Sequence, residues 1–177
     1  MTIIAILLNP TIDQIYEIDN FTVGGTFKVK NSVIYPVGKA ISFALAIREL
    51  DKEKAVIKVI GLIGHKEISL YSDFLSKRNI EFEFVKVKDK TRSNKTINDP
   101  IKRTTTHIRE EGFKIQKKDL GKLINLMETH INEQDYIVFS GSISPGVEDD
   151  FYYNLIINIK RNKNAITILD TNGRALI

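Results

Sequence analysis

The fold of the chain is set by residues 136–146, which read YIVFSGSISPG. Residues 136–140 form a short apolar run typical of a buried β-strand, and the glycines and the proline that follow break the pattern. Apolar residues at helical spacing predict a helix over residues 149–161, and a second apolar strand is predicted at 166–170. A strand, a loop, a helix and a strand in this order are typical of a parallel α/β sheet.

The same alternation continues toward the N-terminus. We predict buried strands at residues 3–8 and 56–60, an alternating strand at residues 82–87, and helices at residues 38–50, 67–78 and 117–131. More polar, alternating segments predict strands of one small, partly exposed sheet, at residues 15–18, 28–35, 92–97 and 104–108. The sequence therefore predicts an α/β fold with a parallel sheet and a small second sheet. Because the last predicted strand ends seven residues before the end of the chain, we expect apolar sheet surface to be exposed there.

Composition and charge exclude several functions. The 177 residues include 26 basic and 22 acidic side chains, a formal charge of +4, and no cysteine. Disulfides, thiol nucleophiles and cysteine-ligated zinc are therefore excluded, and the three histidines, His65, His107 and His130, have no metal-ligand spacing. There is no apolar run long enough to cross a membrane and no secretory signal at the N-terminus, so we expect a cytoplasmic protein without membrane contact. The lysines are dispersed and no basic run is interleaved with aromatic residues, so nucleic-acid binding ranks last among the possible functions.

Polar residues follow several of the predicted strands, at the positions where open α/β sheets bind their ligands. Asp13 lies in the first of these loops, and its carboxylate either accepts sugar hydroxyls or caps the turn. Gly38 and Lys39 lie at a predicted helix start in PVGKAIS, which suits either an anion or an ordinary surface lysine. The glycine spacing of a Walker loop is absent.

Ser140 and Ser142 place two hydroxyl groups and a flexible backbone at the end of the strand at 136–140. The alternative is an ordinary strand-to-helix turn punctuated by glycine and proline. The segment DTNG at residues 170–173 repeats the arrangement after the last predicted strand. If the strands are parallel, these loops line one crevice.

In their order along the chain, the segments LNPTID, PVGKAIS, KTRSN, SGSISPG and LDTNG resemble the N-terminal part of the ribokinase-like (PfkB) sugar kinases. The branch that they most resemble is that of the 1-phosphofructokinases and tagatose-6-phosphate kinases, which phosphorylate phosphosugars with ATP and magnesium. The resemblance covers essentially the whole chain, and it implies that residues 1–177 are the N-terminal part of a single ribokinase-like domain. It also implies a sandwich around a parallel sheet and a small β-sheet lid formed by about residues 14–35 and 92–109.

The resemblance implies roles on the sugar side for four residues. Asp13 matches the family's sugar-hydroxyl-binding aspartate. Gly38 and Lys39 match part of the family's glycine-rich sugar loop. Ser42 stands where the family commonly has a substrate-binding asparagine.

Three further residues are implied on the phosphate side. Arg92 matches an arginine that approaches the substrate phosphate, a role that suits a guanidinium group. Ser140 and Ser142 match the serine-glycine-serine turn near that phosphate. A phosphorylated hexose is therefore the implied ligand, and pairing of lids between subunits implies a homodimer.

The chain departs from the family pattern in several places. Val37 and Ala40 replace glycines of the sugar loop, and His107 and Arg109 occupy lid positions that commonly hold Glu and Asn. The family's C-terminal half, with its anion hole, catalytic base and nucleotide- and magnesium-associated residues, has no counterpart here. We therefore assign no catalytic, nucleotide-binding or metal-binding residue. Since phosphoryl transfer depends on such groups, we expect this polypeptide to be inactive by itself.

Two hypotheses about function stay open at this point. In the first, the chain is part of an ATP-dependent phosphosugar kinase that is active only with a complementary C-terminal polypeptide. In the second, it is a non-catalytic module that binds a phosphosugar or dimerises.

Overall fold

The computed structural model describes residues 1–51 and 55–176 of the chain. Its centre is a five-stranded parallel sheet with the strand order β5-β4-β1-β8-β9. The strands are β1 (Thr2–Leu7), β4 (Val56–Gly64), β5 (Glu81–Val87), β8 (Tyr136–Ser140) and β9 (Ile166–Asp170). The domain predicted from the sequence spans residues 1–177, and residues 52–54 and 177 of it lie outside the described residues.

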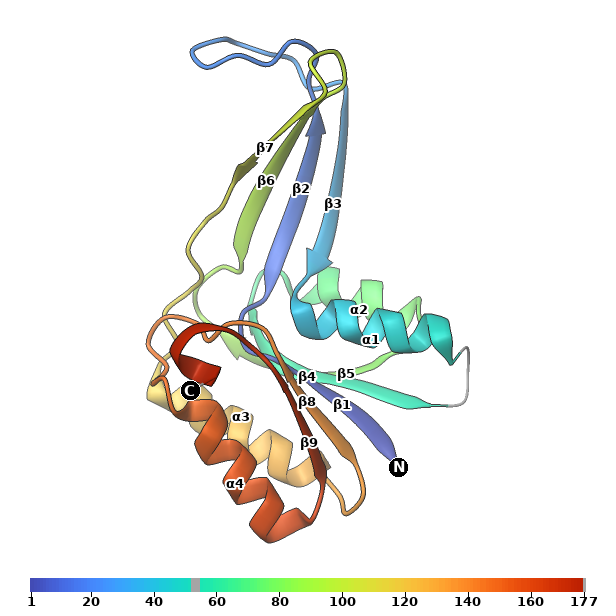
Figure 1. Ribbon diagram of the computed structural model, residues 1–177, viewed down its shortest axis with the longest axis vertical. Coiled ribbons are helices and arrows are strands. Elements are labelled where there is room, and N and C mark those ends of the chain that lie inside the picture. Colours follow the sequence, from blue (N-terminus) through green and yellow to red (C-terminus); the bar gives the residue numbers. More distant parts are fainter. Residues whose placement is uncertain (52–54, 177) are drawn as a thin grey trace.

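Two pairs of helices cover the two faces of this sheet (Figure 1). On one face lie α1 (Lys39–Leu50) and α2 (Ile68–Ser76), and on the other lie α3 (Lys117–His130) and α4 (Phe151–Lys163). A short 3-10 helix, η1 (Gly173–Leu176), follows β9. The α/β class expected from the alternation of helices and strands is confirmed.

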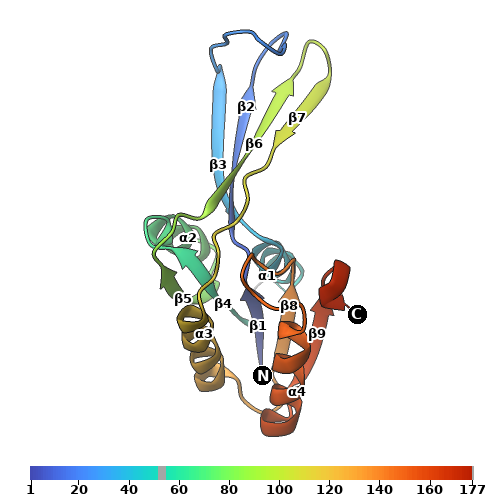
Figure 2. The ribbon, with the colours of Figure 1, turned by 90° about the vertical axis from the view of Figure 1, so that its left-hand side faces the viewer.

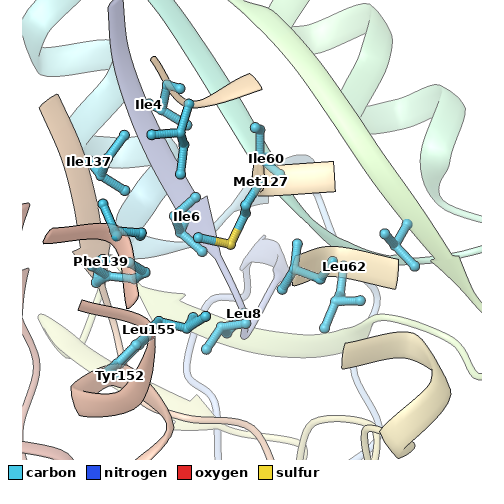
Figure 3. Packing of buried hydrophobic residues seen from close by; sticks show 14 of the residues in the cluster. Ile4, Ile6, Leu8, Ile60, Leu62, Met127, Ile137, Phe139, Tyr152 and Leu155 are labelled. Carbon is cyan, nitrogen blue, oxygen red and sulfur yellow. The ribbon is translucent and has the colours of Figure 1, made fainter. Parts of the chain in front are cut away.

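The central strand β1 is buried on both of its faces. Ile4 and Ile6 pack in one cluster with Met127 of α3 and Leu155 of α4 (Figure 3). The intervening residues of β1 pack in a second cluster with α1 and α2. A strand buried on both faces has a continuous apolar sequence, and this explains why the run at residues 3–8 predicted it.

Apolar side chains are exposed at the β9 edge of the sheet, as expected. Ile166 and Ile168 are 47% and 42% exposed. Ile166 pairs with Tyr136 of β8, and Ile168 pairs with Val138. The two side chains therefore lie on the same face of the sheet as α1, which covers that face only nearer the centre.

A second, four-stranded sheet stands away from the helices (Figures 1 and 2). We call it the small sheet. Its strands are β2 (Thr11–Glu17), β3 (Asn31–Val37), β6 (Arg92–Asp99) and β7 (Thr104–Ile108), in the order β3-β2-β6-β7. The pair β2 and β6 is parallel, while the two outer pairs are antiparallel. The four alternating segments therefore form one sheet, as predicted.

Two predicted strand boundaries are wrong by four residues each. Residues 11–13 were expected in a loop, but they form the first part of β2 because Thr11 pairs with Val37 on one side and with Arg92 on the other. Strand β4 does not end at residue 60 but continues to Gly64, because β5 pairs with it along this whole length. The pairing partners are distant in sequence, so the local pattern carried no signal of either extension.

Asp99 joins the two loops at the tip of the small sheet. Its carboxylate accepts hydrogen bonds from the backbone N–H groups of Asn20, Phe21, Ile101 and Lys102 at 2.8–3.1 Å. Burial acts to raise the pKa of Asp99, but the four hydrogen bonds outweigh burial, and the pKa is lowered.

Glu110 ties down the base of the small sheet in a similar way. Its carboxylate accepts hydrogen bonds from the ammonium group of Lys95 and, at 2.9 Å, from the backbone N–H of Ser93. These bonds outweigh burial and lower the pKa of Glu110 from 4.5 to about 2.

We expect Glu110→Gln to lower the melting temperature by roughly 2–5 °C at neutral pH, because a charge-assisted contact is replaced by a neutral one. The pKa of Glu110 is lower in the folded than in the unfolded chain, so its contribution to stability is present above about pH 4.5 and is lost as the pH falls toward 2. The difference in melting temperature between wild type and variant should therefore shrink over this range. Thermal melts at a series of pH values test this, with the exposed neighbour Glu111→Gln as control. A difference that does not change with pH would contradict the assignment.

Candidate functional site

A cavity of about 150 Å³ opens where β1, β8 and β9 end. It is lined by Asn9, Gly38, Lys39, Arg92, Ser140, Gly141, Ser142 and Asn172. We call it the Arg92 cavity. The structure thus brings together five of the seven predicted substrate-binding residues, which are Gly38, Lys39, Arg92, Ser140 and Ser142. Ser140 and Ser142 lie at the carboxyl end of β8, where open parallel sheets bind ligands. Gly38 and Lys39 lie where β3 ends, and Arg92 lies where β6 begins, so these three come from the base of the small sheet.

The other two predicted residues, Asp13 and Ser42, are not among the residues that line the cavity. Asp13 lies within β2, where its carboxylate accepts a hydrogen bond of 3.2 Å from the amide of Asn94. It still acts on the site, because its charge stabilises the protonated form of Arg92. Ser42 is exposed in the first turn of α1, and its backbone N–H donates to the carbonyl of Gly38.

Gly38 leads the chain from β3 into α1. Its φ angle is +153°, and a Cβ atom at this position would lie 2.5 Å from the side chain of Leu7. Both the conformation and the close contact require glycine. Lys39, the first residue of α1, extends to within 3.6 Å of Asp170 at the end of β9. Both side chains are more than half exposed, so this ion pair adds little to stability and leaves Lys39 available to an anion.

Hydrogen bonds hold the loop after β8 in place. The hydroxyl of Ser140 donates to Asp170 at 2.9 Å, and the buried hydroxyl of Ser144 donates to the carbonyl of Leu8 at 2.8 Å. The hydroxyl of Ser142 instead accepts a hydrogen bond of 3.0 Å from the amide of Asn9. Its own proton has no acceptor within the described residues and is available to a ligand, whereas that of Ser140 is engaged.

Arg92 is oriented by Thr11. Its Nε donates to the hydroxyl of Thr11 at 2.6 Å, and within the described part of the chain its two terminal nitrogens make no hydrogen bond or ion pair. Partial burial lowers the pKa of Arg92, the charge of Asp13 opposes this, and Arg109 adds to it. A guanidinium group stays protonated at neutral pH despite such shifts. Arg92 therefore presents a fixed cation with unused donors to the cavity.

The backbone beside Arg92 is anchored to the main sheet. The buried hydroxyl of Thr91 accepts a hydrogen bond of 3.0 Å from the N–H of Gly64, at the end of β4. The N–H of Thr91 donates to the carboxylate of Glu67 at 2.9 Å. These contacts fix the start of β6 and thereby the base of the Arg92 side chain.

Tyr71 of α2 ties the small sheet to the helical layer. Its hydroxyl lies 2.6 Å from the carbonyl oxygen of Thr11 and 3.0 Å from that of Val37, so that both acceptors share its proton. The side chain is fully buried, and burial raises the pKa of the phenol. The row formed by Val37, Thr11 and Arg92 is thus attached to the core at its middle.

Sequence reasoning missed several residues of the site. Asn9, Gly141 and Asn172 line the cavity, and a signal for them existed, because all three lie in the loops that follow predicted strands. Thr11 carried no such signal, because it is 81 residues from Arg92 and the contact depends on the pairing of β2 with β6.

The described residues do not form a metal site. Among residues 1–51 and 55–176, no group of three or more His, Asp or Glu side chains is arranged to hold a metal ion. Within the same ranges, no helix combines the length and apolar character that a membrane span requires.

The fold and the site together define a class. Five parallel strands between two helix pairs, a projecting small sheet and a polar cavity at the strand ends constitute the ribokinase-like fold. A family model for the pfkB family of carbohydrate kinases matches residues 7–176. The chain belongs to this family, which implies ATP and a metal as cofactors.

Curated relatives and a solved structure agree with this assignment. The 1-phosphofructokinase of Bacillus subtilis is 30% identical over 175 residues, which are 99% of this chain and 55% of the relative. A tagatose-6-phosphate kinase of Staphylococcus epidermidis is 25% identical over 174 residues, which are 98% of this chain and 54% of the relative. Phosphofructokinase-2 from Escherichia coli in complex with fructose-6-phosphate matches with a TM-score of 0.85 at 23% identity, over 99% of this chain and 56% of that one. This chain therefore spans about half the length of the relatives that it matches.

Proposed function

We propose that the chain binds a phosphorylated hexose in the Arg92 cavity and is the sugar-binding part of an ATP-dependent phosphosugar kinase. The observation that carries the proposal is the state of Arg92, which Thr11 fixes through Nε while both terminal nitrogens stay unbonded within the described residues. Two parallel N–H donors suit a phosphate group. Lys39, across the cavity, supplies a second positive charge, and the free proton of Ser142 a third donor.

The sugar hydroxyls would form hydrogen bonds with a different part of the site. Asp13 and Asn94 lie side by side on the small sheet, two register rows beyond Thr11 and Arg92. A carboxylate beside an amide accepts and donates hydrogen bonds, as a hydroxylated ring requires. In this arrangement the small sheet acts as a lid over the sugar.

The contribution of this chain to phosphoryl transfer is then positioning. Transfer depends on holding the acceptor in line with the donor and on stabilising charge. Arg92 and Lys39 would hold the phosphate that the sugar already carries, and Asp13 would orient the ring. ATP would supply the transferred phosphoryl group and the metal would neutralise charge on the phosphates, and no described residue is assigned to either of them.

The first test is thermal unfolding of the purified chain with fructose 6-phosphate, tagatose 6-phosphate or fructose 1-phosphate. A ligand that binds only the folded state must raise the melting temperature. We expect at least one of the three to do so, and unphosphorylated fructose to have no effect at the same concentration. If none of the phosphosugars shifts the transition, the proposal fails. An assay of ADP release from the same samples after addition of ATP and magnesium tests our further proposal that turnover requires a complementary polypeptide.

We also propose that the small sheet pairs with that of a second copy of the chain. Four apolar residues on its outer strands are 40–53% exposed: Val33, Ile34, Tyr35 and Ile108. Strands β3 and β7 are the free edges of the sheet, so their backbone groups are open to pairing. A dimerising, non-catalytic role is the alternative function, and dimers that bind none of the three sugars would favour it. A cytoplasmic location is likewise a proposal.

A further inference from the structure

A second cavity, of about 220 Å³, lies at the end of β5 beside the first turns of α3. It shares no lining residue with the Arg92 cavity. Its walls carry five lysines, which are Lys86, Lys88, Lys114, Lys118 and Lys122. We call it the lysine cavity.

The lining of this cavity is strongly positive. The five lysines face only two acidic side chains, Asp89 and Asp119, so with His65 neutral the lining has a net charge of +3. The whole chain carries +4. Because like charges repel one another, such a lining attracts anions and is stabilised by them.

The lysines are not neutralised by neighbouring carboxylates. One ion pair is formed, between Lys122 and the buried Asp119, with Nζ and Oδ1 4.0 Å apart. No carboxylate oxygen of residues 1–51 and 55–176 lies within 4.0 Å of the Nζ atoms of the four remaining cavity lysines. Four ammonium groups are therefore available to a ligand.

The start of α3 adds donors of another kind. Gln116 precedes the helix without capping it through its side chain, and its carbonyl accepts hydrogen bonds from the N–H groups of Asp119 and Leu120. Within the described part of the chain, the N–H groups of Lys117 and Lys118 have no hydrogen-bond partner. The 14-residue helix also directs the positive end of its dipole toward the lysines. Lysine ammonium groups and a helix N-terminus are both typical partners of phosphate groups.

We propose that the lysine cavity binds a chain of two or three phosphates, either free in solution or as part of a nucleotide. The lining contains no arginine, so it recognises density of negative charge rather than the planar shape of a carboxylate. The site is also close in sequence to Arg92. The N–H of His65 donates to the carbonyl of Val87 at 3.0 Å, and residues 88–91 alone separate that strand end from Arg92. The proposal does not depend on sugar binding in the Arg92 cavity.

Titration calorimetry of the full chain with inorganic tripolyphosphate tests the proposal. We expect saturable binding to one site that weakens as salt is raised. The double variant Lys88→Gln/Lys118→Gln should bind at least tenfold more weakly. The matched control Lys28→Gln/Lys160→Gln removes the same charge from exposed lysines outside the cavity and should bind as the wild type does. All four positions are exposed, so superimposable melting curves of the variants will show that the fold is intact.

Three results would overturn the proposal: no binding at millimolar tripolyphosphate, equal losses in the two double variants, or loss of binding in Arg92→Ala. The second result would mean diffuse attraction to a basic surface, and the third would place the probe in the Arg92 cavity. ATP in place of tripolyphosphate separates the two sources of the ligand. Tighter binding of ATP with the same dependence on Lys88 and Lys118 would identify a nucleotide, and equal binding would identify the phosphate chain alone.

Discussion

Arg92→Ala is expected to weaken phosphosugar binding by about 10- to 100-fold while leaving the folded structure intact. Two charge-assisted hydrogen bonds to the substrate phosphate would be lost, and such a loss amounts to roughly 1.4–2.8 kcal/mol. The fold should tolerate the change because the side chain makes one hydrogen bond, to Thr11, and is only partly buried. Calorimetric titration with the phosphosugar that stabilises the wild type measures the affinity, and a thermal melt without ligand measures stability.

Two control variants separate the role of the charge from the role of geometry. Arg92→Lys keeps the charge but cannot form parallel hydrogen bonds from a fork held at Nε, so we expect it to recover only part of the affinity. Arg103→Ala removes an exposed arginine from the loop between β6 and β7, and should change neither affinity nor melting temperature. Equal affinity of Arg92→Ala and wild type would remove Arg92 from the site.

The main sheet could be predicted because its signals are local. Strands β8 and β9 have the predicted bounds, since each is a short apolar run that glycine or polar residues end abruptly. The strands of the small sheet were harder to predict, because they are polar and their bounds depend on pairing with strands that are distant in sequence. Asp13 was assigned to a loop, and it lies in a strand because Tyr35 and Asn94 pair with it on either side.

The candidate site was predictable to the extent that it is made of strand ends. Lys39 lies at a helix start, Ser140 at a strand end and Ser142 in the loop that follows, and the predicted pattern of strands and helices already gave these three positions. Ser42 was included by resemblance alone, and an α1 register that exposes it keeps it out of the cavity lining. The support of Arg92 by Thr11 and Thr91 depends on contacts between distant segments, which no local pattern encodes.

The largest effect on stability is expected where β4 contacts the loop that precedes Arg92. Gly64 lies at the end of β4 directly against the loop that carries Thr91. A Cβ atom there would collide with the backbone nitrogen of Thr91 and the carboxylate of Glu67, and would lie 2.7 Å from the carbonyl oxygen of Asp89. The Glu67 side chain can rotate away only by giving up its hydrogen bond to Thr91, and the two backbone atoms cannot move without shifting the loop.

We therefore expect Gly64→Ala to destabilise the chain by about 1–3 kcal/mol, the usual cost of overpacking, and to weaken phosphosugar binding because Thr91 and Arg92 move together. The same substitution has the opposite expected effect on stability at Gly121, in the interior of α3. At this position, apart from the backbone of the helix itself, no atom of residues 1–51 and 55–176 lies within 4 Å of the added methyl group. There, alanine should stabilise the chain by about 0.5–1 kcal/mol through its higher helix propensity, without a change in affinity. Urea unfolding and phosphosugar titration of both variants measure the two effects. If Gly64→Ala lowers stability but leaves affinity unchanged, the loop does not transmit the position of β4 to Arg92, and the guanidinium group must be held by Thr11 alone.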